Sequence, residues 1–176
     1  MFYLICLAII GLVLTLDLIS KYLVALNNSN TVVIPHLLKF YYTTNTGSAF
    51  SFLGDKEWAM PMFIALTFVV LAVILGYVVY TIVKKKQLSK WLLVAISLVV
   101  AGAIGNLVDR IAFGYVRDFI FVFYNTKIFT AIFNVADIAL VVGVIMICFY
   151  LLFLDNDAVF KFKKKKAQQV DENKEE

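Results

Sequence analysis

The stretch LICLAIIGLVLTLDLISKYLVAL, residues 4–26, decides the fold class. An apolar run of this length crosses the hydrocarbon core of a bilayer as one α-helix, which takes about 20 residues. The run has no basic start, it carries Asp17 and Lys21, and no small-residue cleavage site ends it, so we expect a permanent span and not a removable signal peptide. Comparable apolar runs follow at residues 58–83, 88–108 and 133–154. The sequence therefore predicts an α-helical membrane protein with four transmembrane helices.

The composition excludes several other classes of protein. Hydrophobic residues make up 62% and charged residues 16% of the 176 residues, against about 45–50% and about 25% in a soluble domain. A globule of this size has too little interior to hide so much apolar surface, and disorder requires low hydrophobicity. Cys6 and Cys148 lie inside apolar runs, so a disulfide framework is not indicated. The single histidine, His36, excludes a paired-histidine zinc site, and we expect neither a metal nor another cofactor.

Basic residues predict the orientation of the spans. Ten lysines lie between the second and third spans or after the fourth, whereas the other two connections hold five lysines and arginines. The positive-inside rule then places both termini in the cytoplasm and the first and third connections on the outer face. We expect residues 1–156 to form a single membrane domain. Residues 157–176 read as a disordered cytoplasmic tail, whose lysines either anchor the topology, the simpler interpretation, or also touch anionic headgroups.

The two outer connections are richer in strand-forming residues than ordinary linkers. Residues 31–53 are rich in β-branched and aromatic side chains, and Asn45-Thr46-Gly47 supplies a turn signal near their middle. Residues 116–124 form a second strand-like, aromatic run. We therefore expect a small β-sheet, formed by the loops and resting on the outer membrane surface, where aromatic residues are enriched.

Polar residues within or beside the spans share one depth, near the outer interface. Ionisable groups in a span are costly, so each is a candidate functional residue. The spacings i, i+3 and i+4 place the members of each helical group on one face, and Asp118 lies on the outer connection between two groups. The set comprises Asp17 and Lys21, then Asn106, Asp109 and Arg110, then Asp118, and finally Asn134 and Asp137.

Each of these groups also has a structural interpretation. Asp17 and Lys21 are equally well read as an intrahelical ion pair, Asp109 with Arg110 as a plain helix end, and Asn134 with Asp137 as a helix cap with a first-turn acid. Their common depth favours a site over four unrelated features. The run AGAIG, residues 101–105, is assigned only to close helix packing.

Carboxylate chemistry is what this residue set supports best. Two carboxyl groups held close together cannot both ionise, so one keeps a proton and can polarise a carbonyl while the other takes a proton from water. Asp17 and Asp109 have basic neighbours, in Lys21 and Arg110, which leaves Asp118 and Asp137 as a modestly preferred pair. No serine or cysteine has a clear basic partner, and the nearest approach to one is Ser20 beside Lys21.

Five ordered motifs resemble those of the bacterial lipoprotein signal peptidases, or signal peptidase II. They are DLISK at 17–21, NTGSAF at 45–50, GAIGNLVDR at 102–110, VRDF at 116–119 and FNVAD at 133–137. The resemblance implies a four-span aspartyl endopeptidase of the bacterial cytoplasmic membrane. Such an enzyme removes signal peptides from prolipoproteins whose lipobox cysteine carries diacylglycerol. Its partners would be these substrates and membrane lipids, without nucleic acid, and we expect a monomer.

Carried over by position, the resemblance makes Asp118 and Asp137 the catalytic pair. The supporting or substrate-binding residues would be Asn45, Gly47, Asn106, Asp109, Arg110, Asn134, Asp17 and Lys21. Among the departures from the family pattern, Arg117 replaces a usual valine; it either lowers the pKa of Asp118 or points to the headgroups by strand alternation. The rival interpretation is a small non-enzymatic transporter or assembly protein, although the repeats and midplane polar groups of a transporter are absent from the sequence.

Overall fold

Four helices long and apolar enough to cross a membrane form the body of the protein. The computed structural model describes residues 2–47, 56–84, 88–124 and 131–154. The helices are α1 (Phe2–Leu26), α2 (Ala59–Val83), α3 (Lys90–Phe113) and α4 (Val135–Phe149), which continues as a short π-helix, η2 (Tyr150–Leu154). The expected fold class is confirmed. The proposed tail at residues 157–176 lies outside the part of the chain that the structure describes.

The third helix is longer than its apolar run. The sequence predicts an end near residue 108, but α3 continues to Phe113 and stops at Gly114, whose φ of 76° is left-handed. The extra turn contains Asp109, which is fully buried, so the polar end of the helix faces protein and not the headgroups. Hydropathy alone therefore underestimates the length of a helix whose last turn contains polar residues that bind other side chains.

Small residues allow α1 and α4 to pack closely on α3. A methyl group added at Gly102 would collide with the backbone carbonyl of Ala136 on α4, and one added at Gly105 would lie 2.6 Å from Oδ2 of Asp17 on α1. On α4, a methyl group at Gly143 would lie 2.7 Å from Cγ2 of Val99. The packing role expected for residues 101–105 is therefore confirmed, because these positions have no room for a side chain.

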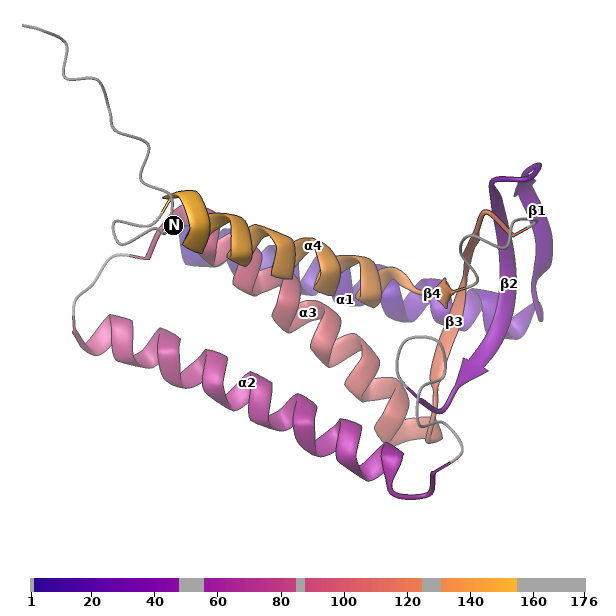
Figure 1. Cartoon of the computed structure of the whole chain (residues 1–176), viewed down its shortest axis with the longest axis horizontal. Helices are drawn as coiled ribbons and strands as arrows, with labels where there is room; N and C mark the ends of the chain where they lie inside the picture. The colour runs from indigo at the N-terminus through magenta and orange to yellow at the C-terminus, as the bar shows by residue number, and fades with distance from the viewer. Residues whose placement is uncertain (1, 48–55, 85–87, 125–130, 155–176) are drawn as a thin grey trace, which may run out of the picture.

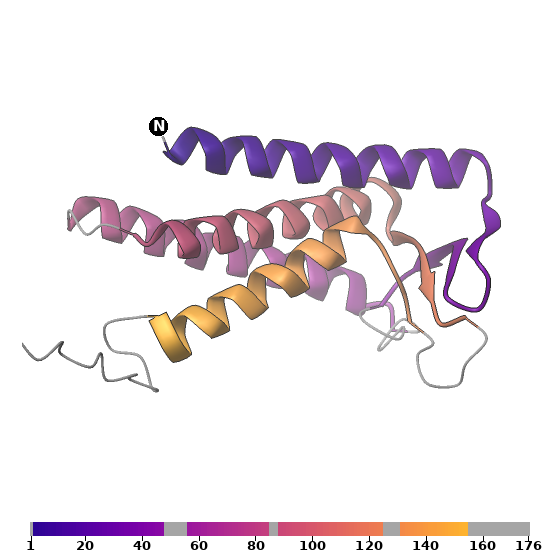
Figure 2. The same cartoon turned by 90° about the horizontal axis from the view of Figure 1, so that it is seen from above.

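The second helix stands apart from the other three. Figure 1 shows α2 nearest to α3 at the sheet end and apart from α1 and α4, and in Figure 2 it passes behind α3. Only Ala59 and Thr81 of its residues are buried, and large side chains such as Leu66 and Val73 are exposed. Most of the α2 surface is thus available to lipid.

A four-stranded antiparallel sheet lies across one end of the helices (Figure 1). Its strands are β1 (Asn30–Ile34), β2 (Leu38–Asn45), β3 (Val116–Val122) and β4 (Ile132–Phe133), in the order β1-β2-β3-β4. The sheet predicted from the two loops is therefore confirmed. The beginning of α1 and the end of η2 lie at the opposite end of the molecule (Figure 1).

The turn that joins β1 to β2 does not lie at Asn45-Thr46-Gly47, where the sequence has its turn signal. The chain reverses at Pro35, His36 and Leu37, where the Leu37 N–H donates to the Ile34 carbonyl at 3.1 Å and His36 has a φ of 63°. Asn45-Thr46-Gly47 instead ends β2, with Asn45 opposite Val116 of β3. The misassigned turn signal is still a local turn, because the Asn45 side chain accepts from the Gly47 N–H at 3.0 Å.

Candidate active site

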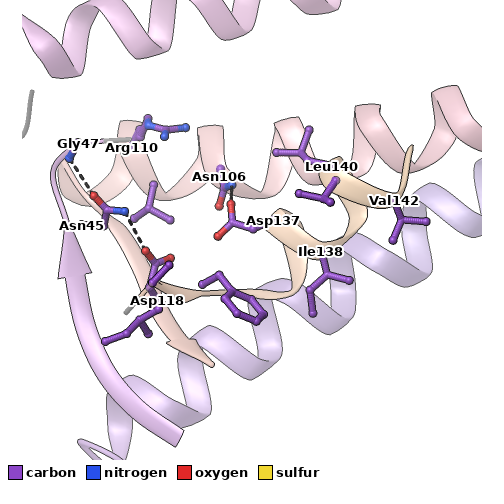
Figure 3. Close-up of a pocket in the computed structure, with 14 residues that line it drawn as sticks. Asn45, Gly47, Asn106, Arg110, Asp118, Asp137, Ile138, Leu140 and Val142 are labelled. Atoms are coloured by element: carbon purple, nitrogen blue, oxygen red, sulfur yellow. Dashed lines mark hydrogen bonds between the residues drawn. The ribbon is translucent and has the colours of Figure 1, made fainter. Parts of the chain in front are cut away.

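A cavity of about 610 Å³ opens where the sheet meets the helices. Figure 3 shows Asp118 and Asp137 facing this cavity from a strand and a helix, with Asn45, Asn106 and Arg110 around them. Its far side follows the apolar surface of α4. The lining residues are Asn45, Gly47, Asn106, Arg110, Val116, Asp118, Ala131, Ile132, Phe133, Asp137, Ile138, Leu140, Val141 and Val142.

Asp118 is held by one amide donor on each carboxylate oxygen. Asn45 donates to Oδ2 at 2.9 Å, and Asn134 donates to Oδ1 at 2.6 Å. The side chain is 2% exposed. Burial, followed by repulsion from Asp137, raises the pKa of Asp118 to about 6, against the lowering effect of the two amides. This carboxyl group therefore keeps its proton to a higher pH than an ordinary aspartate does.

Asp137 lies in the first turn of α4, where the helix cap positions it. The Asn134 side chain accepts from the Asp137 N–H at 2.9 Å, and the Asp137 side chain accepts from the Asn134 N–H at 3.1 Å, which forms a capping box. Its other oxygen accepts from Nδ2 of Asn106 at 2.7 Å. The cap expected from the sequence is present, and it also points the carboxylate into the cavity (Figure 3).

Lys21 determines which way the Asn106 amide points. The lysine ammonium donates to Oδ1 of Asn106 at 2.9 Å. Since an ammonium group can only donate, the amide oxygen of Asn106 must face Lys21 and its NH₂ group must face Asp137. Lys21 therefore orients the amide group that donates to Asp137, although Lys21 itself has no contact with Asp137 among those that the structure shows.

Asp17 links the first helix to the last. It forms the expected ion pair with Lys21, with Oδ2 2.7 Å from Nζ. Its Oδ1 also accepts from the backbone N–H of Ala136, at 2.8 Å, in the first turn of α4. A carboxylate at a helix N-terminus is favoured by the helix dipole. The ion pair therefore also holds the helix that carries Asp137.

Asp109 is paired with Arg117 and not with its sequence neighbour Arg110. Nη2 of Arg117 lies 2.6 Å from Oδ1 of Asp109, and Lys21 lies 3.6 Å from Oδ2. Arg117 is 9% exposed, so the expectation that it points to the headgroups is wrong. Strand alternation does turn it away from the cavity, but the bend at Gly114 folds β3 back over α3 and brings Arg117 onto Asp109.

Arg110 lines the cavity, and its guanidinium carbon lies 5.4 Å from the ring centroid of Phe63 on α2. Its Nε is buried without a hydrogen-bond partner among the residues that the structure places. The sequence did not reveal two contacts at the site, that of Arg117 with Asp109 and that of Phe63 with Arg110, because neither follows from helix or strand spacing. Within the described ranges, no group of three or more histidine, cysteine or acidic residues is placed to hold a metal ion.

The fold and the cavity together define a membrane enzyme with a pair of aspartates, Asp118 buried and Asp137 half-buried, facing one cavity at one end of four helices. A family model described as signal peptidase (SPase) II matches residues 9–153. The chain belongs to the signal peptidase II family.

Similar proteins and structures agree with this assignment. The lipoprotein signal peptidase of Pseudomonas putida is 39% identical over 166 residues, which cover 89% of this chain and 86% of that protein. That of Clostridium novyi is 37% identical over 120 residues, covering 68% and 76%. A bacterial membrane enzyme solved by the in meso method at 2.3 Å is 36% identical with a TM-score of 0.72, covering 84% of this chain and 87% of that one. The family resemblance is confirmed, and the transporter alternative has no support.

Proposed function

We propose that this chain, a lipoprotein signal peptidase, cleaves its substrates by an aspartic mechanism with Asp118 and Asp137 as the catalytic pair. The observation that carries the proposal is that two carboxylates from different elements face one cavity, each fixed by donors on both oxygens. The raised pKa of Asp118, to about 6, supports the retention of one shared proton.

The mechanism divides the work between the two carboxyl groups. The ionised one takes a proton from a water molecule as the water oxygen attacks the carbonyl carbon of the scissile peptide bond. The protonated one gives its proton to the carbonyl oxygen, which yields a neutral tetrahedral diol. When this collapses, the peptide C–N bond breaks, the leaving nitrogen takes the proton that came from the water, and a diol hydroxyl returns a proton to the other carboxylate, so the pair again holds one proton. The proton belongs to the pair as a unit, and no covalent intermediate forms.

The remaining site residues would hold this arrangement or the substrate backbone. Asn45, Asn106 and Asn134 donate to the carboxylates, while Asp17, Lys21 and Asp109 fix the elements behind them. Gly47 has a buried N–H that orients Asn45. Arg110 lines the cavity, and its Nε has no hydrogen-bond partner among the described residues, so its guanidinium would bind a carbonyl oxygen of the substrate chain.

The substrate class follows from the two ends of the cavity. The apolar wall formed by Ile138, Val141 and Val142 suits a transmembrane signal helix, and the polar end suits the peptide bond to be cut. Diacylglyceryl chains on the lipobox cysteine would lie in the bilayer beside the exposed surface of α2. The lipid would thereby place the scissile bond at the depth of the two aspartates.

We further propose that the sheet and cavity lie on the outer face of the bacterial cytoplasmic membrane, with both termini in the cytoplasm. The lysine distribution supports this orientation. The single domain of residues 1–156 would act as a monomer, because the described site is completed by residues of one chain.

The test is cleavage of a diacylglyceryl-modified prolipoprotein by the purified protein in detergent. Asp118→Asn and Asp137→Asn should each lower turnover by about a thousandfold or more, and the double variant should lose little more, because each removes half of one proton-sharing unit. Gly76→Ala, at an open position on α2, serves as the control. Near-normal turnover in either folded aspartate variant would remove that residue from the pair.

A further inference from the structure

We propose that Arg117 is a positioning residue for the catalytic pair, acting through Asp109 to fix Asp118 against α3. This inference rests on the aspartic mechanism proposed above.

The first line of support is that one carboxylate binds both the backbone and the side chain of Arg117. Asp109 accepts the Arg117 N–H at 2.9 Å, Nη2 at 2.6 Å, and Nε at 3.2 Å to each oxygen. A forked guanidinium–carboxylate contact fixes orientation as well as distance. With the backbone bond added, residue 117 can neither slide nor rotate relative to α3. Asp118 is joined to it by the next peptide bond.

The second line of support concerns the edge of β3 that faces away from β2. Beside Asp118, side chains and not a neighbouring strand bind the backbone of this edge. On the edge of β3 away from β2, β4 pairs only with Ile120 and Phe121. At Arg117 the backbone N–H goes to Asp109, and the carbonyl accepts from Nδ2 of Asn134 at 3.5 Å. The open edge of the strand is therefore completed by α3 and by the cap of α4.

The guanidinium is itself held on a second side. Its carbon lies 4.6 Å from the ring centroid of Phe113, the last residue of α3, within the range of a cation–π contact. Although burial lowers the pKa of Arg117, hydrogen bonding and attraction from Asp109 outweigh it and raise the pKa above its ordinary value. The group therefore stays charged at any pH at which the enzyme works.

These contacts connect both catalytic carboxylates to the same helix, α3. Asn106 and Asp109 lie three residues apart on the same helix; Asn106 donates to Asp137, and Asp109 holds Arg117. Two neighbouring side chains of α3 thus help to set the separation between Asp118 and Asp137, together with Asn134, which bonds to both. Loss of the Arg117 side chain would leave only the backbone N–H bond to Asp109 at this point of β3. We expect the weakened attachment to misplace Asp118 relative to Asp137.

The experiment compares Arg117→Val, Arg117→Gln and Arg117→Lys by steady-state kinetics on the diacylglyceryl-modified prolipoprotein. We expect kcat to fall about tenfold to a hundredfold for valine and glutamine, as for a misplacement of about 1 Å, with KM changed by less than about threefold. Lysine, which keeps the charge but not the fork, should recover part of kcat. Lys39→Gln is the control, because Lys39 is a basic residue of the same sheet whose ammonium lies over the Tyr41 ring.

Several results would overturn the inference. These are a kcat within about twofold of the parent in the valine variant, or an equal loss of kcat in Lys39→Gln. If the valine and glutamine variants do not fold, the folded lysine variant decides: a kcat at least about threefold lower at unchanged KM supports the role, and an unchanged kcat refutes it. Asp118→Asn in the same assay separates the two proposals, since its retained activity would reject the aspartic mechanism whatever Arg117 does.

Discussion

Asparagine side chains control the surroundings of the two carboxylates that we propose to be catalytic. Asn45, Asn106 and Asn134 each turn their NH₂ group toward an aspartate, and each is oriented by a partner on its oxygen. These partners are Gly47 N–H, Lys21 Nζ and Asp137 N–H, respectively. An amide oriented in this way is a preorganised donor, so it needs no rearrangement during the reaction.

Asp118 makes stability depend on pH in a definite direction. Its pKa is raised from 3.8 to about 6 in the folded protein, so the folded state binds the proton more tightly than the unfolded state. Stability from this group is therefore fully present below pH of about 4 and is lost as pH rises through about 6. Relative to the parent, Asp118→Asn should gain stability between these limits, by about 3 kcal/mol at most.

Thermal unfolding in detergent at a series of pH values measures this difference, with Lys39→Gln as a control that leaves the carboxyl group in place. The offset between Asp118→Asn and the parent should grow from pH 4 to pH 7 and then level off. A constant offset would mean that Asp118 does not bind a proton in this range.

Among the structural elements, α3 is the helix on which the others are assembled. Gly105 leaves space for Oδ2 of Asp17, and a methyl group there would lie 2.6 Å from it. Gly105→Ala should therefore push α1 away from α3 and destabilise the protein by about 1–3 kcal/mol, as overpacking does. Gly76→Ala, with nothing within 4 Å, should be neutral or slightly stabilising.

The apparent melting temperature in detergent compares the two alanine variants, and prolipoprotein cleavage gives a second measurement. Gly105→Ala should lose both stability and activity, because Asp17 also holds the first turn of α4. Equal melting temperatures for Gly105→Ala and Gly76→Ala would show that α1 moves aside without cost.

The elements differ in how far the sequence could predict them. Bilayer thickness fixes the length of an apolar span, so the four helices were predicted within a few residues, apart from the buried last turn of α3. The turn at Asn45-Thr46-Gly47 was misassigned because a local signal cannot show that β2 pairs along its length with β3. The turn lies at Pro35 and His36 instead.

The site shows the same division between local and long-range information. The shared depth of Asp17, Asp118 and Asp137 followed from helix periodicity and span direction. The pairing of Asp109 with Arg117 did not, because it depends on the left-handed bend at Gly114 that returns β3 onto α3. The periodicity of a sequence does not predict contacts between side chains of different helices and strands.

For the whole molecule, the orientation in the membrane can be tested by cysteine labelling. Thr31 on β1 and Lys84 after α2 are both exposed and lie at opposite ends of the molecule. With Cys6 and Cys148 replaced by alanine, Thr31→Cys should react with a membrane-impermeant maleimide in intact cells, and Lys84→Cys should react only after the cells are opened.

The cysteine-free parent gives the background for this assay, and prolipoprotein cleavage confirms that each variant is folded. Reaction of Lys84→Cys in intact cells would invert the orientation and place Asp118 and Asp137 on the cytoplasmic side. The lysine distribution would then have failed as a guide to this chain.

The bond between Asp17 and the N–H of Ala136 joins residues 119 positions apart. During synthesis, the first helix enters the bilayer long before the last one has been made. In that interval Lys21, one turn away, is the counterion that Asp17 carries with it. When the fourth helix inserts, the Ala136 N–H in its first turn binds the Asp17 carboxylate, which already lies at the same depth. The same step brings Asp137 to the site. Under the proposed aspartic mechanism, the growing chain would therefore gain proteolytic activity only when the fourth helix has inserted.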